Sequence, residues 1–144
     1  MGEIAGRTPG RTGAAALVIE TGERAAWHGR ERFPMQSVYK FPIAMAVLRA
    51  VDEGRLRLDQ AVEIGAGEMA PRGLHSPIRD AHPGGVTMPL EDVLRYDVAE
   101  SDGTASDALL RLAGGAAKVT AYLEGLGVRG VRVATSERAM ARGE

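Results

Sequence analysis

The most apolar stretch of the chain runs from residue 41 to residue 51, with apolar residues on all sides of a helical projection. This pattern predicts a helix that is buried within a larger core. Pro42 is tolerated in the first turn of a helix and is costly later, so we expect the regular helix to begin near Phe41. Residues 37–40 then form its leading turn, and residues 52–54 (Asp-Glu-Gly) end it.

The residues before this helix predict a β-hairpin, and those after it predict further helices. Residues 14–20 and 25–28 are the expected strands, joined by the turn signal Thr21-Gly22-Glu23. Residues 56–89 are rich in Gly and Pro and predict a long connection across the surface. Helical periodicity then returns. It predicts helices from about 90 to 98, from 105 to 112 and from 119 to 126, followed by a brief extended piece with Val131 and Val133.

The composition narrows the class of protein without naming an activity. The 144 residues are 44% hydrophobic and carry a net charge of −1, which suits one ordinary domain and gives no sign of a nucleic-acid or membrane-surface protein. Arg49 and Asp52 interrupt the apolar run, so it is too short to span a membrane. The chain has no cysteine, which excludes disulfides, a thiol nucleophile and a Cys-based zinc site. Residues 1–7 lack the apolar core of a secretory signal, so we expect a cytoplasmic protein or an export signal missing from this chain.

One of the few lysines of the chain lies in the segment that is expected to be buried. Of the 18 basic residues, only Lys40 and Lys118 are lysines. Arginine stays charged in proteins, whereas a desolvated lysine can lose its proton and act as a base. One helical or 3₁₀ turn brings the Ser37 hydroxyl and the Lys40 amine onto one face, beside free N–H groups that can hold an oxyanion. The pair therefore predicts an activated nucleophile, although Ser-x-x-Lys by itself is a short and common pattern.

Two further polar elements each have a structural and a chemical interpretation. Ser101-Asp102-Gly103 lies between two predicted helices, where Ser and Asp are favoured simply as N-caps. Glu137 lies near the C-terminus, where a lone glutamate is usually a solvated charge. Neither element indicates an activity alone. The histidines fit no metal-ligand spacing and are expected at the surface: His28, His75 and His82.

Together, the order and spacing of these elements resemble the class A serine β-lactamases. Residues 33–48 are very similar to the nucleophile helix of the extended-spectrum subgroup of that class, the PER- and VEB-like enzymes. Residues 101–103 match the Ser-Asp-Asn loop of the family, and Glu137 lies at the usual distance of the Ω-loop glutamate from it. Residues 135–140 resemble the Glu-x-x-Met form of that loop in the same subgroup. The resemblance covers about residues 13–140, nearly the whole chain.

The resemblance implies a role for each of four residues. Ser37 would attack the β-lactam carbonyl and form an acyl-enzyme, with Lys40 taking part in its deprotonation. Ser101 would pass a proton toward the lactam nitrogen, and Glu137 would activate the water that hydrolyses the ester. Both Lys40 and Glu137, the latter through a water, remain open as the base for acylation. The resemblance calls for no metal or cofactor, and it implies a small-molecule β-lactam as partner, no nucleic acid, no membrane, a monomer if complete, and a periplasmic or secreted location.

The resemblance also implies an α+β fold, the β-lactamase/transpeptidase-like fold, in which a five-stranded antiparallel sheet lies beside an all-helical region. Residues 13–33 would be the first hairpin of that sheet, and residues 34–144 the helical region with the nucleophile helix and the start of the Ω-loop. Residues 1–144 would thus form a partial single catalytic domain, the N-terminal half of the fold, without the other strands and the last helix. Met1 would fall inside the family's first helix.

Two departures from the family pattern bear on activity. Gly103, the candidate substrate-binding position, stands where the family most often has an asparagine that contacts the substrate. The chain contains no Lys-Thr-Gly triad, which in the family lies on a strand that supplies a second oxyanion donor. Losing one such donor typically costs about 10²–10³ in rate. We therefore expect a truncated β-lactamase that is inactive alone; the alternatives are a penicillin-binding DD-peptidase-like acyl transferase, which generally lacks the deacylating glutamate, and a non-catalytic remnant.

Overall fold

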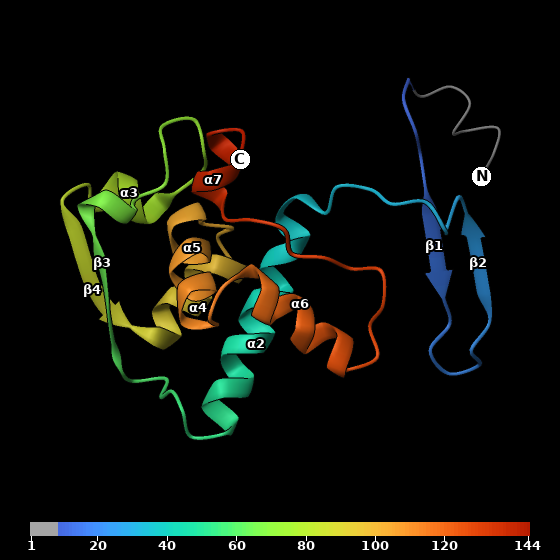
Figure 1. Ribbon diagram of the computed structural model, residues 1–144, viewed down its shortest axis with the longest axis horizontal. Coiled ribbons are helices and arrows are strands. Elements are labelled where there is room, and N and C mark those ends of the chain that lie inside the picture. Colours follow the sequence, from blue (N-terminus) through green and yellow to red (C-terminus); the bar gives the residue numbers. More distant parts are fainter. Residues whose placement is uncertain (1–8) are drawn as a thin grey trace. The chain divides into compact units, whose positions relative to one another are not determined.

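The computed structural model describes residues 9–144, whose contacts form two compact units that divide after Met35. The expected remnant of a first helix at Met1 lies outside the described residues. In the first unit, β1 (Ala14–Leu17) pairs antiparallel with β2 (Arg24–Trp27). Figure 1 shows this pair, and it is the predicted hairpin.

The turn of the hairpin also lies where the sequence predicts it. Val18 N donates to Glu23 O at 2.9 Å, and Gly22 N donates to Val18 O at 2.8 Å. Gly22 has a φ of +73°, a left-handed conformation that glycine adopts without steric cost. Every residue of β1 and β2 is exposed, and two strands alone have little stability without further packing.

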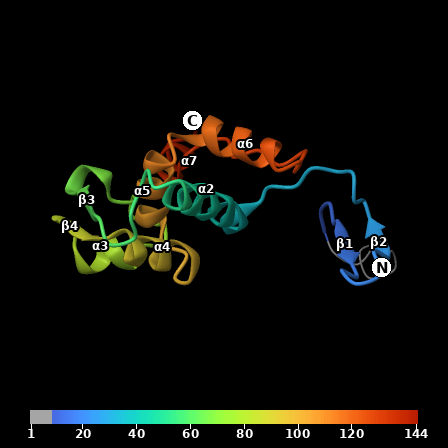
Figure 2. The ribbon, with the colours of Figure 1, turned by 90° about the horizontal axis from the view of Figure 1, so that it is seen from below.

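In the second unit, the predicted apolar helix is α2 (Lys40–Asp52). It packs against α4 (Leu90–Val98), α5 (Gly103–Leu112) and α6 (Ala116–Gly125), which are the three helices predicted downstream. Figures 1 and 2 both show α2 running alongside α4 and α5. None of the helices within residues 9–144 has both the length and the apolar character that crossing a membrane requires.

The leading turn of α2 is the 3₁₀ helix η1 (Gln36–Tyr39), as predicted. Ile43 and Val47 of α2 are fully buried, because they face the neighbouring helices. Within residues 9–144 the helix is not buried on every side, since Phe41 and Leu48 are 61% and 43% exposed. One face of this helix is therefore apolar and open to water.

Residues 56–89 are folded, which corrects the prediction of a long surface connection. They contain β3 (Ala61–Gly65), η2 (Ala66–Glu68), α3 (Pro77–Ala81) and β4 (Gly85–Pro89). In Figure 1 the two strands lie side by side next to α3. The elements are three to five residues long, so the Gly and Pro residues between them dominate the sequence pattern.

The pairing of β3 and β4 explains what the sequence pattern concealed. The strands run antiparallel, with Val62 opposite Met88 and Ile64 opposite Val86. Val62 and Ile64 are buried while their neighbours in β3 are more exposed, so this strand has the alternation of a half-buried strand. Five residues are too few for that alternation to stand out between turn residues.

The extended piece predicted near the C-terminus is not a strand. Val131 and Val133 lie in irregular backbone, and neither belongs to a sheet of the described chain. The backbone of Val133 bonds to a side chain and not to a neighbouring strand. The Thr120 hydroxyl accepts from Val133 N and donates to Val133 O, both at 3.1 Å. The chain then forms α7 (Glu137–Ala141), which packs against α5.

A buried aspartate, Asp102, fixes the turn that precedes α5. Its Oδ1 accepts from Ala105 N at 2.9 Å, which confirms the N-cap interpretation of this residue. Its Oδ2 accepts from Ile78 N at 2.7 Å, and the Ser76 hydroxyl donates to the same carboxylate at 3.0 Å. Ser76 also shares a 2.7 Å hydrogen bond with the Thr104 hydroxyl. The network therefore ties the start of α3 to the start of α5.

The substitution Asp102→Ala should lower the free energy of unfolding by about 3–5 kcal/mol, because three buried donors lose their acceptor at once. Urea unfolding followed by circular dichroism measures this loss. Asp59→Ala is the control, since Asp59 is exposed and, within residues 9–144, its side chain bonds only to the nearby Arg57. The unfolding midpoint of this variant should stay nearly unchanged. Equal midpoints for the two variants would contradict the role of the network.

Candidate active site

The four residues predicted to carry the chemistry all line one pocket of about 360 Å³ in the second unit. Ser37 comes from η1 and Lys40 from the start of α2. Ser101 comes from the turn before α5, and Glu137 from the start of α7. The fold thus gathers three distant segments around one cavity. The other lining residues are Gln36, Tyr39, Leu74, His75, Met140 and Ala141.

The Lys40 ammonium group makes the central contacts of this pocket. Its Nζ donates to the carbonyl oxygen of Ser101 at 2.6 Å and to the Ser101 hydroxyl at 3.4 Å. The same nitrogen lies 3.3 Å from Glu137 Oε1, in an ion pair whose side chains are 5% and 12% exposed. Salt screens such a shielded pair less than it screens a surface pair. The prediction that this lysine is kept from solvent is confirmed.

Ser37 lies exposed at the wall of the pocket. Ser37 and Lys40 both lie in the described part of the chain, and the expected hydrogen bond between the Ser37 hydroxyl and Lys40 is not formed. Lys40 instead donates its hydrogen bonds to Ser101. Catalytic hydrogen bonds are often long without substrate and tighten when it binds. Ser37 also lies in the first turn of a helical segment, where N–H groups have no partner within the helix.

Ser101 reaches Lys40 from a strained backbone. Its φ is +55°, a conformation that is uncommon for any residue except glycine and costs about 1–3 kcal/mol. The surrounding backbone holds it there, because Asp102 N donates to Tyr96 O and Gly103 N donates to His75 O, both at 3.0 Å. The strain therefore belongs to a turn that presents both Ser101 oxygens to the lysine.

Glu137 is held in place by Asp107, a residue that the sequence analysis missed. The Asp107 carboxylate accepts from Glu137 N at 2.7 Å and from Arg138 N at 3.0 Å. Burial raises the pKa of Asp107, and the hydrogen bonds from these two amides oppose the rise. Ser136 completes the start of α7 as its N-cap and accepts from Ala139 N at 3.1 Å. No sequence signal marks Asp107, because its partners lie 30 residues away.

Tyr39 is a second residue of the pocket that the sequence analysis missed. Its side chain is buried, and its hydroxyl accepts from Ser106 Oγ at 3.3 Å. Burial raises the pKa of the Tyr39 phenol, the hydrogen bond from Ser106 opposes the rise, and the charge of Glu137 adds to it. The phenol therefore keeps its proton. In the sequence, Tyr39 is indistinguishable from the apolar residues that follow it.

Gly103, the expected substrate-binding position, is not among the described residues that line the pocket. It is the buried first residue of α5, and a Cβ added to it would lie 3.4 Å from His75 O and 3.6 Å from the Glu137 side chain. His75 lines the pocket instead and hydrogen-bonds to Glu100 O at 2.9 Å. All three histidines are exposed, as predicted: His28, His75 and His82.

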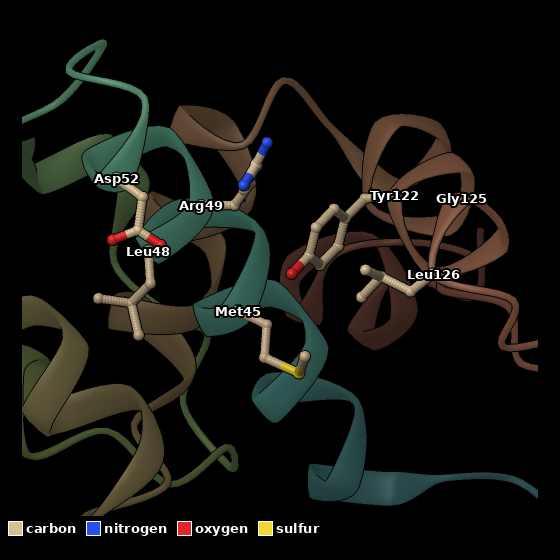
Figure 3. A pocket seen from close by; sticks show the side chains of 7 residues that line it. All are labelled: Met45, Leu48, Arg49, Asp52, Tyr122, Gly125 and Leu126. Carbon is tan, nitrogen blue, oxygen red and sulfur yellow. The ribbon is translucent and has the colours of Figure 1, made fainter.

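A second pocket, of about 610 Å³, lies between α2 and α6. Figure 3 shows Met45 of α2 beside Tyr122 of α6 and Leu126, the residue that follows α6, in this pocket. The wall of this pocket is mainly apolar, and none of the predicted site residues lines it. It is therefore not the candidate active site. Within residues 9–144, no group of three His, Asp or Glu side chains has the arrangement of a metal site.

The chain belongs to the β-lactamase enzyme family, whose family model matches residues 2–144. Beta-lactamase VEB-1 from Pseudomonas aeruginosa is 41% identical over 108 residues, which cover 75% of this chain and 36% of that protein. Extended-spectrum beta-lactamase PER-1 from the same organism is 37% identical over 111 residues, which cover 76% of this chain and 36% of that protein. These relatives confirm the resemblance to the extended-spectrum subgroup.

Solved structures confirm the expected fold. A beta-lactamase from Chitinophaga pinensis has a TM-score of 0.92 and 41% identity, with 98% of this chain and 52% of that chain covered. An ancestral class A beta-lactamase has a TM-score of 0.88 and 36% identity, with 96% of this chain and 52% of that chain covered. The chain therefore has the α+β fold of the N-terminal half of a class A β-lactamase. It spans about a third of the curated relatives' length and about half of these solved chains.

The substitution Asp107→Ala should release α7 from α5, because the N–H groups of Glu137 and Arg138 lose their shared acceptor. Hydrogen exchange measured by mass spectrometry should then show faster exchange in residues 131–144. Asp92→Ala is the control, since Asp92 is a partly exposed acid whose one ion pair in the described part of the chain is with Arg95. Unchanged exchange of residues 131–144 in Asp107→Ala would contradict the anchoring role.

Proposed function

We propose that the chain carries the catalytic residues of a serine β-lactamase that opens the ring of penicillins and cephalosporins through an acyl-enzyme. The observation that carries the proposal is the contact of Lys40 with both Ser101 and Glu137, in the pocket that Ser37 lines. The similarity to VEB-1 and PER-1 supports it. Such an activity would confer resistance to these antibiotics.

In acylation, Ser37 Oγ bonds to the lactam carbonyl carbon and the carbon–nitrogen bond of the ring breaks. The hydroxyl proton passes through a water to Glu137, or to Lys40 after Lys40 has given its own proton to Glu137, 3.3 Å away. Ser101 Oγ gives its own proton to the lactam nitrogen and regains one from Lys40, whose Nζ lies 3.4 Å away. On either route Glu137 returns a proton to Lys40 once Ser101 is protonated again, so Glu137 is a carboxylate when deacylation begins. The Ser37 N–H supports the oxyanion that forms on the carbonyl oxygen.

In deacylation, Glu137 takes a proton from a water molecule, whose oxygen bonds to the ester carbonyl. The bond to Ser37 Oγ then breaks, and Ser37 recovers its proton as the ring-opened acid leaves. Glu137 lines the same pocket as Ser37, which favours hydrolysis over the alternative of a DD-peptidase-like acyl transferase. An enzyme of that second class would keep its acyl group.

Gly103 has no side-chain amide that could contact the acylamino group of a β-lactam substrate. We therefore expect this position to affect the range of substrates. Residues 1–144 also contain no Lys-Thr-Gly triad, and a missing oxyanion donor costs about 10²–10³ in rate. The proposal therefore includes low activity for residues 1–144 alone. A non-catalytic remnant is the remaining alternative.

The rest of the proposal follows the same family. Residues 1–144 are part of one catalytic domain, with residues 13–33 as the first hairpin of its sheet and residues 34–144 as its helical region. The protein acts as a monomer in the periplasm or outside the cell, and its partner is a small β-lactam. All the proposed steps use protein side chains and water, so they call for no metal or cofactor.

The substitution Glu137→Gln should let a penicillin adduct accumulate, because the ester loses the base that activates water. Intact-mass spectrometry after prolonged incubation with penicillin should show a long-lived mass increase in this variant. The double variant Ser37→Ala with Glu137→Gln is the control and should show none. An adduct that also forms without Ser37, or no adduct in Glu137→Gln, would refute the proposed acylation.

A further inference from the structure

The guanidinium group of Arg79 in α3 bonds to the backbone of the loop that precedes this helix. Its Nη1 donates to Pro71 O at 2.7 Å and to Leu74 O at 2.8 Å, and lies 3.3 Å from Ala70 O. Its Nε and Nη2 both donate to Asp80 Oδ1, at 2.9 and 2.7 Å. The Arg79 side chain is only 18% exposed. A charged donor makes stronger hydrogen bonds than a neutral one, so this loop is held firmly.

The loop that Arg79 contacts contains a tight turn of residues 71–74. Leu74 N donates to Pro71 O at 3.2 Å, and Gly73 has a φ of +102°. A positive φ at the third residue is what a type II turn requires, and glycine adopts it without steric cost. The sequence therefore sets the shape of the turn, and Arg79 fixes it by bonding to the carbonyl group at each end.

The end of this turn forms one wall of the candidate active-site pocket. Leu74 and His75 line the pocket together with the four candidate catalytic residues, and we call these two residues the Leu74–His75 wall. His75 is tied to the segment that carries Ser101, because its carbonyl oxygen accepts from Gly103 N at 3.0 Å. Arg79 adds the hold on Leu74, one residue earlier.

We propose that Arg79 is a positioning residue of the candidate active site, which holds the Leu74–His75 wall in the shape that receives the substrate. This inference rests on the proposed function and deepens it, since it concerns how the same pocket binds a β-lactam. Arg79 is not among the described residues that line the pocket, so it acts through the turn. A wall that is already ordered spares the loss of side-chain and loop freedom that binding would otherwise cost.

The contacts of Arg79 predict an effect on substrate binding and not on the chemical step. Ser37 and Lys40 come from η1 and α2, and the bonds of Lys40 go to Ser101 and Glu137. Without Arg79 the turn loses a charged donor and becomes free to move, while these contacts stay in place. The substrate concentration that gives half-maximal acylation should therefore rise about tenfold, with a maximal rate that stays within about twofold.

Hydrogen exchange tests the hold of Arg79 on the turn without any β-lactam. In Arg79→Met the backbone of residues 70–76 should exchange about ten times faster, because the turn opens more often. Arg79→Lys should restore most of the protection, since one ammonium nitrogen carries three N–H donors for the same carbonyl oxygens. Arg72→Met is the matched control and should change nothing, because Arg72 is an exposed arginine of the same turn.

Asp80→Ala provides a second variant that keeps the arginine and removes the carboxylate that orients it. Asp80 is exposed, so its loss should not endanger the fold. This variant should also speed the exchange of residues 70–76, by a smaller factor than Arg79→Met. Unchanged exchange in a folded Arg79→Met, or in Asp80→Ala if Arg79→Met does not fold, would overturn the inference.

The effect on binding is measured with Glu137→Gln as the reference chain, in which the penicillin adduct should accumulate. The rate of adduct formation at a series of penicillin concentrations gives the half-saturating concentration and the maximal rate. Adding Arg79→Met should raise the first about tenfold and leave the second within about twofold, and adding Arg79→Lys should bring both close to the reference. A lower maximal rate with an unchanged half-saturating concentration would contradict a role in positioning the wall.

The two measurements separate this inference from the proposed function. A Glu137→Gln chain that never forms an adduct would refute the proposed function, and the exchange of residues 70–76 would still decide whether Arg79 holds the turn. A chain that forms the adduct, with the same exchange and the same half-saturating concentration after Arg79→Met, would support the proposed function and overturn the role of Arg79.

Discussion

The ammonium group of Lys40 holds together three segments that are distant in the sequence. It bonds to the Ser101 carbonyl at 2.6 Å and pairs with Glu137 at 3.3 Å, while its own helix begins one turn after Ser37. A buried ammonium is stable only when such partners surround it. The requirement to satisfy this one charge therefore brings the strained Ser101 turn and the start of α7 to the same pocket.

The helix α5 supplies the supports for both of these partners. Asp102 caps its first turn and fixes the backbone next to Ser101. Asp107, further along the same helix, accepts the two N–H groups at the start of α7 and so fixes Glu137. One rigid helix thus sets the positions of both groups that Lys40 contacts. Groups held by a regular element in this way are placed more precisely than groups on free loops.

The parts of the structure that follow from local pattern were predictable from the sequence. The helix 40–52 and the helices after residue 90 show a helical period or an apolar run. The four candidate site residues were proposed from motif spacing and family resemblance, and they line one pocket. The fold of residues 56–89 was not predictable, because five-residue strands between Gly and Pro show little periodicity. Asp107 was missed for a different reason: its importance comes from its hydrogen bonds to residues far away in the chain.

The shielding of the Lys40 amine is the central claim, and competitive acetylation of the two lysines tests it most directly. Brief treatment of the folded chain with acetic anhydride, followed by peptide mass spectrometry, compares Lys40 with the exposed Lys118 in one sample. We predict that Lys118 reacts at least about tenfold faster, because a buried, ion-paired ammonium is rarely free to attack the reagent. The difference should vanish in urea. Equal rates for the two lysines in the folded chain would contradict the account.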